Sequence, residues 1–566
     1  MAMTVGAALL TRLKQLGVDC IFANSGTDFP PIIEGLAEAE ARGIDLPEAI
    51  VIPHEGAAMA MAHGYYLGSG RAQAVIAHTN VGLANCVLGA INAATEHVPI
   101  LLMSGRSPVL EGGWLGARSV PIGWGQEMRD QAAMVREPCK WDYELRFPEQ
   151  ICDVLDRAHG IANSTPRGPV YLSLPREVLC ETVPEDLTDR RPQMQPSVAS
   201  PRPDDIARAA RILAEAKHPV VFAQRGAGSA EGYAALSDLA EKWGIPVCQY
   251  WATQLAMSTC HPMAADADPV PLLAEADAIL VIGALAPWSP DVASPAPDCT
   301  VIQMGEDPLQ ARFPIRNFRA DLSLPGEIGP TLLALSDAMA PRYAAHAATC
   351  VERHRVVAHR NTKDLSRRRA QAAAGRDAPR LGKPWVSHAL AEAVRDRDAA
   401  IFNELGCMLP FMELDGPESW FDGPLSGGLG WGFPAAMGHK MARPERTVIA
   451  ATGDGSHIFA NPVACHQIAE ALGISIIVIV LNNREWGAVR KSVLDIYPDG
   501  YASKANTIPL TSLAPSPDFT QVAAASRAWA RHVATADAFE TALTDALAHV
   551  EANRGLALIE VAVGAG

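Results

Sequence analysis

Long hydrophobic runs are missing from this sequence. Its longest apolar stretches, such as ISIIVIVL at 474–481, are far shorter than the roughly 20 residues that a membrane-spanning helix needs. The N-terminal segment MAMTVGAALLTRLKQLGVDC contains Arg12 and Lys14, which predicts an amphipathic helix and not a signal peptide. We therefore expect a cytoplasmic protein with no membrane partner.

An excess of basic residues is also missing. The chain has 47 Lys and Arg against 63 Asp and Glu, a formal charge of -16. Nucleic-acid binding depends on neutralising phosphates with basic side chains, so we expect no nucleic-acid partner.

The eleven cysteines form no CxxC pair, which favours reduced thiols over a disulfide framework or a zinc site. No G-x-G-x-x-G follows a clear strand, and HEGAAMAMAH lacks the HExxH spacing of zinc hydrolases.

What is present is a threefold alternation of apolar runs with helical stretches. This alternation is typical of parallel α/β sheets, and at 566 residues the chain is too long for a single core. We predict three parallel-sheet α/β domains, at 1–183, 200–340 and 383–566. A proline-dotted linker separates the first two. The charge run at 353–380 indicates a solvated interdomain helix and linker, although it superficially resembles a nucleic-acid arm.

The first and third domains share a pattern. The stretches EGAAMAMAHGYYLGSGRAQAVIAHTNVG and FPAAMGHKMARPERTVIAATGDGS both give a small-residue helix, a basic turn, an apolar strand and a polar stop containing glycine. This indicates one α/β module used twice, with a different module between.

Two strand-like runs in the third domain end in polar residues. TVIAAT leads into Gly453-Asp454-Gly455, and ISIIVIVL leads into Asn482-Asn483. Because parallel strands joined by a helix present their carboxyl ends at one sheet edge, we expect these two stops to meet. Carboxylate and amide oxygens suit Mg²⁺, and glycines with the following Ser456 allow a phosphate to approach the backbone. Taken alone, GDG or NN is also common in ordinary turns that follow a strand.

This spacing, with 26 residues between GDG and NN, resembles the thiamine diphosphate-binding motif, and the resemblance covers nearly the whole chain. It implies a pyrimidine-binding domain, a central domain and a diphosphate-binding domain. It further implies that Asp454, Asn483 and the backbone carbonyl of Glu485 hold Mg²⁺. In this family the first and third domains meet across a subunit interface, so the resemblance implies a homodimer or homotetramer with active sites between subunits.

A thiamine diphosphate enzyme needs a carboxyl group that hydrogen-bonds the pyrimidine nitrogen N1′ of the cofactor. Glu55 follows the strand-like EAIVIP and precedes a run of alanines. Taken alone, a glutamate at a helix start is usually a capping residue. By its place in the first domain, the resemblance implies that Glu55 is the catalytic acid.

Narrower resemblances point to benzoylformate decarboxylase, through SGGLGWGFPAAMG at 426–438 and NNREWGAVR at 482–490. They imply that Leu429 props the cofactor, that His78 is an active-site histidine and that Thr27 takes the place of a substrate-binding serine. For His78 the alternative is a buried, satisfied histidine, and for Trp486, at an aromatic position of the pocket, it is a core tryptophan. We also assign Gly406 and Cys407 to the cofactor site.

The chain departs from its relatives in informative ways. The second catalytic histidine of benzoylformate decarboxylase is absent from GALAPWSPDV, which offers Trp288 and Ser289 instead, and no His-His pair occurs. GQEMRDQAAMVREPCKW resembles the acetolactate synthases, which implies a role for Gln126 at the cofactor or substrate. Arg176 stands where that family has a lysine. Ser492 replaces its expected tryptophan, and no persuasive FAD signature is present.

We therefore expect thiamine diphosphate- and Mg²⁺-dependent cleavage or formation of C–C bonds on a 2-oxo acid, without FAD. The main prediction is non-oxidative decarboxylation, with carboligation favoured by the missing second histidine. An acetolactate synthase-type carboligase and a lyase or hydrolase of hydroxyacyl or diketone substrates remain alternatives. An inactive regulatory homologue is the alternative outside enzymology.

Overall fold

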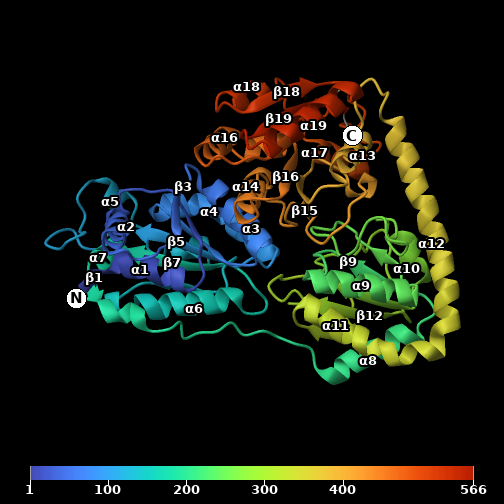
Figure 1. The fold of residues 1–566 in the computed structure, drawn as a ribbon, viewed down its shortest axis with the longest axis horizontal. Helices are drawn as coiled ribbons and strands as arrows, with labels where there is room; N and C mark the ends of the chain where they lie inside the picture. Colours follow the sequence, from blue (N-terminus) through green and yellow to red (C-terminus); the bar gives the residue numbers. More distant parts are fainter. Residues whose placement is uncertain (1, 506, 565–566) are drawn as a thin grey trace. The chain divides into compact units, whose positions relative to one another are not determined.

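The computed structural model describes residues 2–505 and 507–564. Three sheets of parallel strands follow one another along this chain, each flanked by helices (Figure 1). A small antiparallel pair joins β1 (Ala2–Thr4) to β8 (Thr182–Pro184). The predicted fold class of three parallel-sheet α/β domains is confirmed. Their predicted boundaries stay predictions.

The first sheet has the strand order β3-β2-β4-β5-β7-β6. Its strands are β2 (Cys20–Ala23), β3 (Glu48–Val51), β4 (Gln73–Ala77), β5 (Ile100–Arg106), β6 (Asp142–Glu144) and β7 (Val170–Pro175). The accompanying helices are α1 (Val5–Gln15), α2 (Pro30–Arg42), α3 (Glu55–Ser69), α4 (Thr79–Thr95), α5 (Ile122–Gly125), α6 (Ile151–Asn163) and α7 (Arg176–Leu179). The direction of chain winding reverses between β2 and β4. In open α/β sheets, ligands bind at the strand carboxyl ends beside such a switch point.

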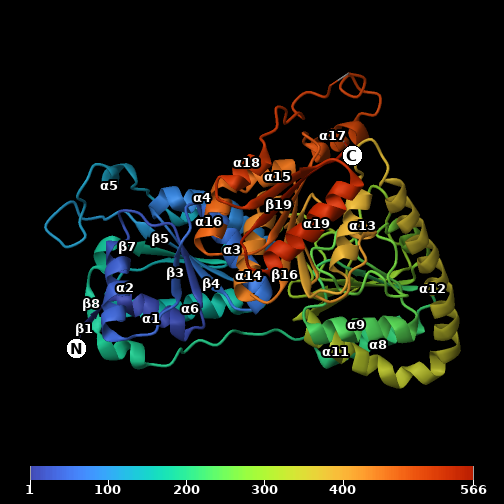
Figure 2. The same ribbon diagram turned by 45° about the horizontal axis from the view of Figure 1, so that its top comes forward.

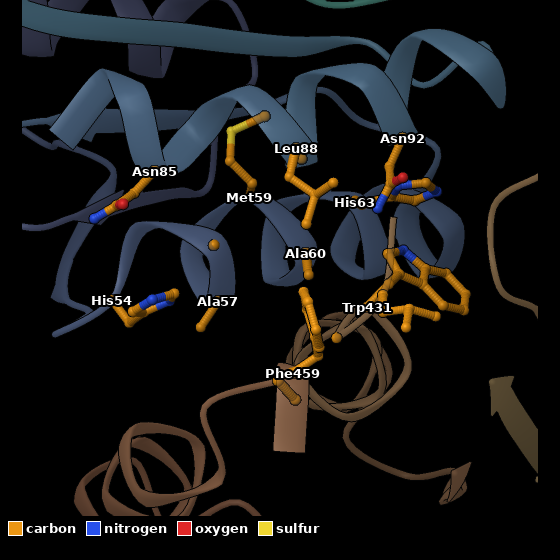
Figure 3. Close-up of a pocket in the computed structure, with 15 residues that line it drawn as sticks. His54, Ala57, Met59, Ala60, His63, Asn85, Leu88, Asn92, Trp431 and Phe459 are labelled. Carbon is orange, nitrogen blue, oxygen red and sulfur yellow. The ribbon is translucent and has the colours of Figure 1, made fainter. Parts of the chain in front are cut away.

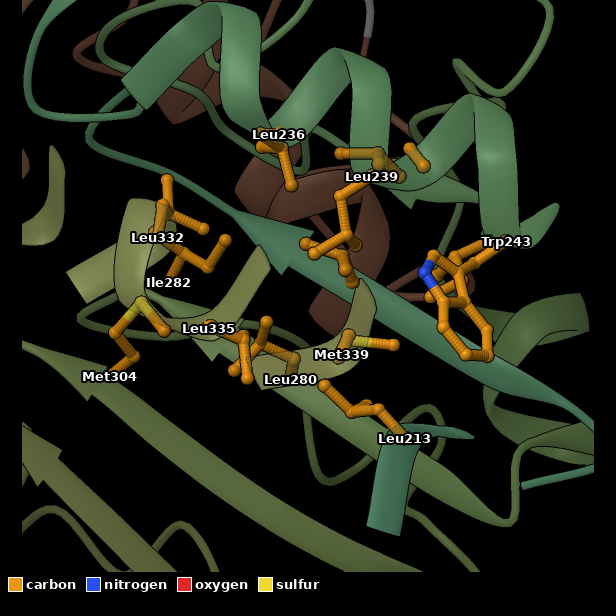
Figure 4. Packing of buried hydrophobic residues seen from close by; sticks show 14 of the residues in the cluster. Leu213, Leu236, Leu239, Trp243, Leu280, Ile282, Met304, Leu332, Leu335 and Met339 are labelled. Atoms are coloured by element: carbon orange, nitrogen blue, oxygen red, sulfur yellow. The ribbon is translucent and has the colours of Figure 1, made fainter. Parts of the chain in front are cut away.

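The central sheet has the order β10-β9-β11-β12-β13. Its strands are β9 (Pro219–Ala223), β10 (Val247–Cys248), β11 (Ala278–Ile282), β12 (Thr300–Gly305) and β13 (Leu322–Pro325). The helices α8 (Pro203–Glu215), α9 (Ala230–Trp243) and α11 (Ile328–Met339) lie together on one face (Figure 2), and α10 (Val270–Glu275) precedes β11. Leucines of these helices, with Trp243 and Met339, pack on Leu280 and Ile282 (Figure 4). Burial of this apolar surface stabilises the central domain.

The third sheet has the order β15-β14-β16-β17-β19-β18. Its strands are β14 (Ala399–Glu404), β15 (Trp420–Asp422), β16 (Thr447–Gly453), β17 (Ile477–Asn482), β18 (Trp529–Val533) and β19 (Ala557–Ala562). The helices are α13 (Lys383–Val394), α14 (Gly432–Ala442), α15 (Asp454–Phe459), α16 (Pro462–Ala471), α17 (Gly487–Ile496), α18 (Phe519–Ala524) and α19 (Ala536–Glu551). Here the winding reverses between β14 and β16, so this sheet repeats the arrangement of the first. The repeated module predicted from the sequence is consistent with this.

The chain divides into two compact units that cut across this order. The first unit combines the chain up to Ser197 with Pro424–Glu445 and Ile458–Ser475. The second contains Val198–Gly423, Arg446–His457 and the chain from Ile476 onward. The third sheet therefore belongs to the second unit, whereas α14 and α16 belong to the first.

Glycines explain why α14 joins the first unit. A Cβ on Gly64 of α3 would lie 1.9 Å from the carbonyl oxygen of Ala435, and one on Gly438 of α14 would lie 2.0 Å from that of Met61. The two helices therefore touch backbone to backbone, which no larger residue permits at these positions. The small-residue helices seen in the sequence serve this close packing.

The charged residues of α1 and of the charge run at 353–380 differ in how far they are buried. Arg12 of α1, in the helix predicted to be amphipathic, is buried: its side chain is 1% exposed and its Nε lies 2.7 Å from Oδ1 of Asp156. The predicted charge run lies on α12 (Tyr343–Ala374) and the segment after it, largely exposed and partly paired, with Arg369 binding Glu413. None of the helices in the described part of the chain has the length and hydrophobicity of a membrane span.

Candidate active site

The two polar strand ends of the third domain meet at the carboxyl edge of its sheet, next to the switch point between β14 and β16. β16 and β17 are parallel neighbours, with Gly453 opposite Leu481. Asp454 begins α15 directly after β16, and its Oδ2 accepts the backbone N–H of Arg484 at 2.9 Å. The prediction that GDG and NN lie together is therefore confirmed by the geometry.

Oxygen atoms of three predicted metal ligands lie in this turn. Asp454 and Asn483 are buried, at 3% and 8% exposure. Oδ1 of Asn483 accepts the N–H of Glu485 at 3.0 Å, and the carbonyl of Glu485 accepts the N–H of Gly487. Arg484 between them has φ +62°, a left-handed conformation that is uncommon outside glycine and often found at functional sites.

Trp486 closes one side of this turn. A Cβ on Gly455 would lie 2.4 Å from the Trp486 ring, so the indole covers the glycine and no other residue fits there. Trp486 is only partly buried. This placement puts it beside the GDG turn and not in the centre of the hydrophobic core.

The end of β14 adjoins the same turn. A Cβ on Gly406 would lie 2.5 Å from the carbonyl oxygen of Ala451 in β16. The backbone N–H of Cys407 donates to Oδ1 of Asn403 at 2.7 Å, and burial raises the pKa of the Cys407 thiol to about 12. Cys407 is thus a neutral thiol, and its segment offers closely packed backbone at the switch point.

The residues at this edge fit a magnesium diphosphate group. The hydroxyls of Thr452 and Ser456 are buried and have no hydrogen-bond partner in the described part of the chain, and such groups are costly to leave unsatisfied. Burial raises the pKa of Asp454, against the effect of nearby backbone N–H groups. Carboxylate, amide and carbonyl oxygens form a donor set suited to a hard cation.

The first unit holds the predicted acid, Glu55, in a defined orientation. Glu55 opens α3 and is 6% exposed. Its Oε1 accepts the side-chain N–H of Asn24 and its Oε2 that of Asn85, both at 2.9 Å. A Cβ on Gly82 would lie 2.9 Å from Oε1. Two amides and a glycine therefore fix the carboxylate.

Asn24 and Asn85 were missed by the sequence analysis. Asn24 directly follows β2, at the switch point of the first sheet, and Asn85 lies two turns into α4. The position of Asn24 after a predicted strand was a usable signal. Nothing local in the sequence marked Asn85.

His78 follows β4 at the same switch point and forms a second polar cluster. Its Nδ1 lies 2.5 Å from Oδ1 of Asp28, and Nε2 lies 2.9 Å from Nε2 of Gln126. The hydrogen bond from His78 to Asp28 raises the pKa of His78, and the charge of Glu55 acts in the same direction. His78 is partly buried and both of its ring nitrogens have partners, so its catalytic role stays a prediction. Asp28 is a further residue that the sequence analysis missed.

Glycines make room for this pair. A Cβ on Gly26 would lie 2.1 Å from Nδ1 of His78, and one on Gly105 would lie 1.5 Å from Oδ2 of Asp28. Asp28 also accepts the N–H of Thr79, which has φ +40°. Backbone from three strand ends is thus packed directly against the two side chains.

Thr27 lines a small cavity beside His78. The cavity has a volume of about 10 Å³, and its lining residues include Thr27, Asp28, Ser107, Gln126 and Arg176. A space of this size holds about one water. Arg176 donates to the backbone carbonyls of Gly116, Thr27 and Ala117, so in this structure it secures the loop after β5.

Leu429 lines a separate pocket of about 80 Å³ in the first unit. The pocket is formed by α3 and α4 with Gly430, Trp431 and Phe459 (Figure 3). Gly430 has φ +86°, and a Cβ there would lie 2.7 Å from the backbone of Phe459. This fixes the loop that carries Leu429.

The structure brings the predicted residues together in two groups. Glu55, His78, Thr27, Gln126 and Leu429 belong to the first compact unit, and the second contains the following predicted residues: Gly406, Cys407, Gly453, Asp454, Gly455, Ser456, Asn483, Glu485 and Trp486. Trp288, which stands where a second histidine was sought, is 3% exposed and packs edge-on against Phe222 in the core of the central domain.

Comparison with known proteins matches the chain to three family models. Residues 3–134 match the N-terminal TPP binding domain of thiamine pyrophosphate enzymes, 206–335 the central domain and 404–561 the C-terminal TPP binding domain. Benzoylformate decarboxylase of Pseudomonas aeruginosa is 28% identical over 96% of this chain and 97% of its own length. A probable acetolactate synthase large subunit of Methanocaldococcus jannaschii is 25% identical over 95% of this chain and 89% of its own.

A solved structure has the same fold. The thiamine diphosphate-dependent 4-hydroxybenzoylformate decarboxylase of Rhodococcus jostii superposes with a TM-score of 0.78 and 23% identity, covering 100% of this chain and 99% of that one. At this identity the likeness concerns the fold.

Proposed function

The chain belongs to the thiamine pyrophosphate enzymes, and from this premise we propose that it decarboxylates a 2-oxo acid and can pass the product on to a second carbonyl compound. The observation that carries this proposal is the orientation of Glu55 by Asn24 and Asn85, in a chain that also has the oxygen-rich turn of Asp454 and Asn483. A protein that served only as a scaffold would need neither an oriented Glu55 nor the oxygen-rich turn, so their presence together favours an enzyme.

When bound, thiamine diphosphate supplies a carbon nucleophile and an electron sink for cleavage of the bond to the carboxylate. Asp454, Asn483 and the carbonyl of Glu485 would hold Mg²⁺, with Ser456 and the glycines beside it meeting the diphosphate. Leu429 and Trp486 would support the cofactor, and Gly406 and Cys407 would offer backbone to it.

The role of Glu55 is to hold and exchange a proton at N1′ of the pyrimidine. Each of its oxygens accepts one amide N–H and retains a lone pair for a further partner. Because both amides bind the carboxylate in one orientation, Glu55 is preorganised and needs no rearrangement when the cofactor arrives.

His78 would deliver a proton to the substrate-derived carbon from Nε2. In the neutral ring, Nδ1–H donates to Asp28 and Nε2 accepts from Gln126. On protonation Nε2 becomes a donor, and the amide of Gln126 must rotate to present its oxygen or give way to substrate. Thr27 and Gln126 would bind polar substrate atoms beside it.

We propose a cytoplasmic homodimer or homotetramer. An exposed face of α4 carries Val81, Leu88 and Ile91, which are 50%, 41% and 37% exposed, and Asn85 lies on this same helix face. Apolar side chains gathered beside a functional residue favour burial against a second copy.

A panel of 2-oxo acids tests the reaction. Purified protein with Mg²⁺ and thiamine diphosphate is incubated with pyruvate, branched-chain oxo acids and benzoylformate, and CO₂ and organic products are measured. The proposal expects CO₂ release that depends on Glu55. Free aldehyde as the dominant product would contradict the preference for carboligation, which rests on the absence of a second histidine.

Absence of CO₂ from every acid would favour the lyase or hydrolase alternative. Failure of the wild-type protein to bind thiamine diphosphate would favour an inactive homologue.

A further inference from the structure

The ammonium group of Lys383 lies beside the end of β14 without a matching anion. Lys383 is the first residue of α13 and is partly buried. Its Nζ donates to the backbone carbonyl of Leu405 at 2.9 Å. Among the described residues, no carboxylate lies within 4.0 Å of this nitrogen. An ammonium has three donors, so two remain for another ligand.

This nitrogen is close to the GDG turn. The carbonyl oxygen of Leu405 that binds Nζ is 3.3 Å from where a Cβ on Gly453 would stand. Leu405 also forms an isolated bridge with Thr452. Lys383 thus binds the carbonyl of Leu405, and Leu405 in turn lies against Thr452 and Gly453, the two residues that precede Asp454.

The charges of Lys383 and Asp454 influence each other's pKa. Burial lowers the pKa of Lys383, and the neighbouring Cys407 and then Asp454 oppose this effect. The same interaction acts to lower the pKa of Asp454, which burial raises. Each charge therefore feels the other, yet the two do not form an ion pair.

We propose that Lys383 is a further ligand of the cofactor's diphosphate. This inference rests on the proposed place of the diphosphate at the GDG turn. A magnesium diphosphate together with the carboxylate of Asp454 carries net negative charge, and Lys383 is a nearby, partly buried cation that offsets it. Burial makes such an interaction stronger than it is in water.

Lys383 also stabilises the backbone at Leu405, and the test must separate this structural effect from binding of the diphosphate. Leu405 has φ +58°, a strained conformation for a branched apolar residue, and the bond from Nζ helps to hold it. Lys383→Gln keeps a donor for the Leu405 carbonyl but removes the charge, and Lys383→Arg keeps the charge. Lys383→Met removes both.

The experiment measures binding of pyrophosphate and of thiamine diphosphate, each with Mg²⁺, by calorimetry, together with thermal unfolding of the apoprotein. We expect Lys383→Gln and Lys383→Met to weaken both ligands at least about tenfold and Lys383→Arg to retain most of the affinity. Lys140 provides the control, because its ammonium also donates to backbone carbonyls, those of Ile161 and Ser164, in a segment without predicted cofactor residues.

Wild-type affinity in Lys383→Gln, with loss only in Lys383→Met and a lower melting temperature, would assign a purely structural role and overturn the inference. Its failure leaves the proposed function intact provided that the wild-type protein binds thiamine diphosphate. If the wild-type protein binds neither ligand, both proposals fall.

Discussion

His78 and Asp28 form a close pair, with Nδ1 and Oδ1 2.5 Å apart, in a pocket that only glycine at positions 26 and 105 leaves open. The pairing holds the imidazole with Nε2 toward Gln126. It also gives Asp28 a role that its sequence position alone does not reveal, as a residue that positions His78.

Asp28→Asn should lower the pKa of His78, because the neutral amide no longer stabilises the imidazolium. The protonated ring persists to higher pH in the wild-type protein, so the alkaline limb of the rate profile should move to lower pH in the variant, by about 1 pH unit. Steady-state rates against pH, with the exposed Asp45→Asn as control, provide the measurement. An unshifted profile would show that His78 does not limit the rate through its protonation.

Glu55→Gln should abolish most of the decarboxylation, by about 100-fold or more, because an amide cannot exchange a proton with the pyrimidine. The variant keeps the shape of the side chain, so binding of thiamine diphosphate should change little. Glu48→Gln, on the exposed edge strand β3, should behave like the wild-type protein. A variant with full activity would remove Glu55 from the mechanism.

Asp454→Asn should raise the Mg²⁺ concentration needed for thiamine diphosphate binding by about tenfold or more, since a neutral oxygen binds Mg²⁺ less strongly than a carboxylate. Titrations of the cofactor at several Mg²⁺ concentrations measure this effect. Asp537→Asn, at a side chain that is 85% exposed, is the control. Equal metal dependence in the two variants would contradict the assignment.

His63 should make the free energy of unfolding depend on pH in the acid range. It is fully buried beside Trp431, with ring centroids 5.3 Å apart, and burial lowers its pKa to about 3. In the unfolded chain a histidine takes its proton near pH 6.5, so stability should fall as the pH drops from about 6.5 toward 3, by up to about 1.4 kcal/mol per pH unit for this group.

His63→Phe keeps an aromatic ring against Trp431 and should remove that part of the slope. Urea unfolding at a series of pH values measures it, with the exposed His359→Phe as the control. The same slope in the His63 variant and the wild-type protein would show that other groups dominate acid sensitivity.

Local sequence determined much of this protein. Apolar runs of strand length alternating with helical stretches predicted three parallel α/β domains, because burial on both faces requires such runs. The polar residues after β16 and β17 predicted a shared edge that includes Asp454, whereas Glu55 and His78 were assigned through the resemblance to a known family.

Only the tertiary structure decided which side chains complete these sites. Asn85 contacts Glu55 across 30 residues and Asp28 contacts His78 across 50, and no motif in the sequence links the members of either pair. Lys383 reaches the end of β14 because α13 packs beside it, and α14 joins the first unit because glycines let it touch α3. The local sequence determines where a strand ends and which residues follow it. The packing of helices and strands that are far apart in the sequence determines which side chains meet at that end.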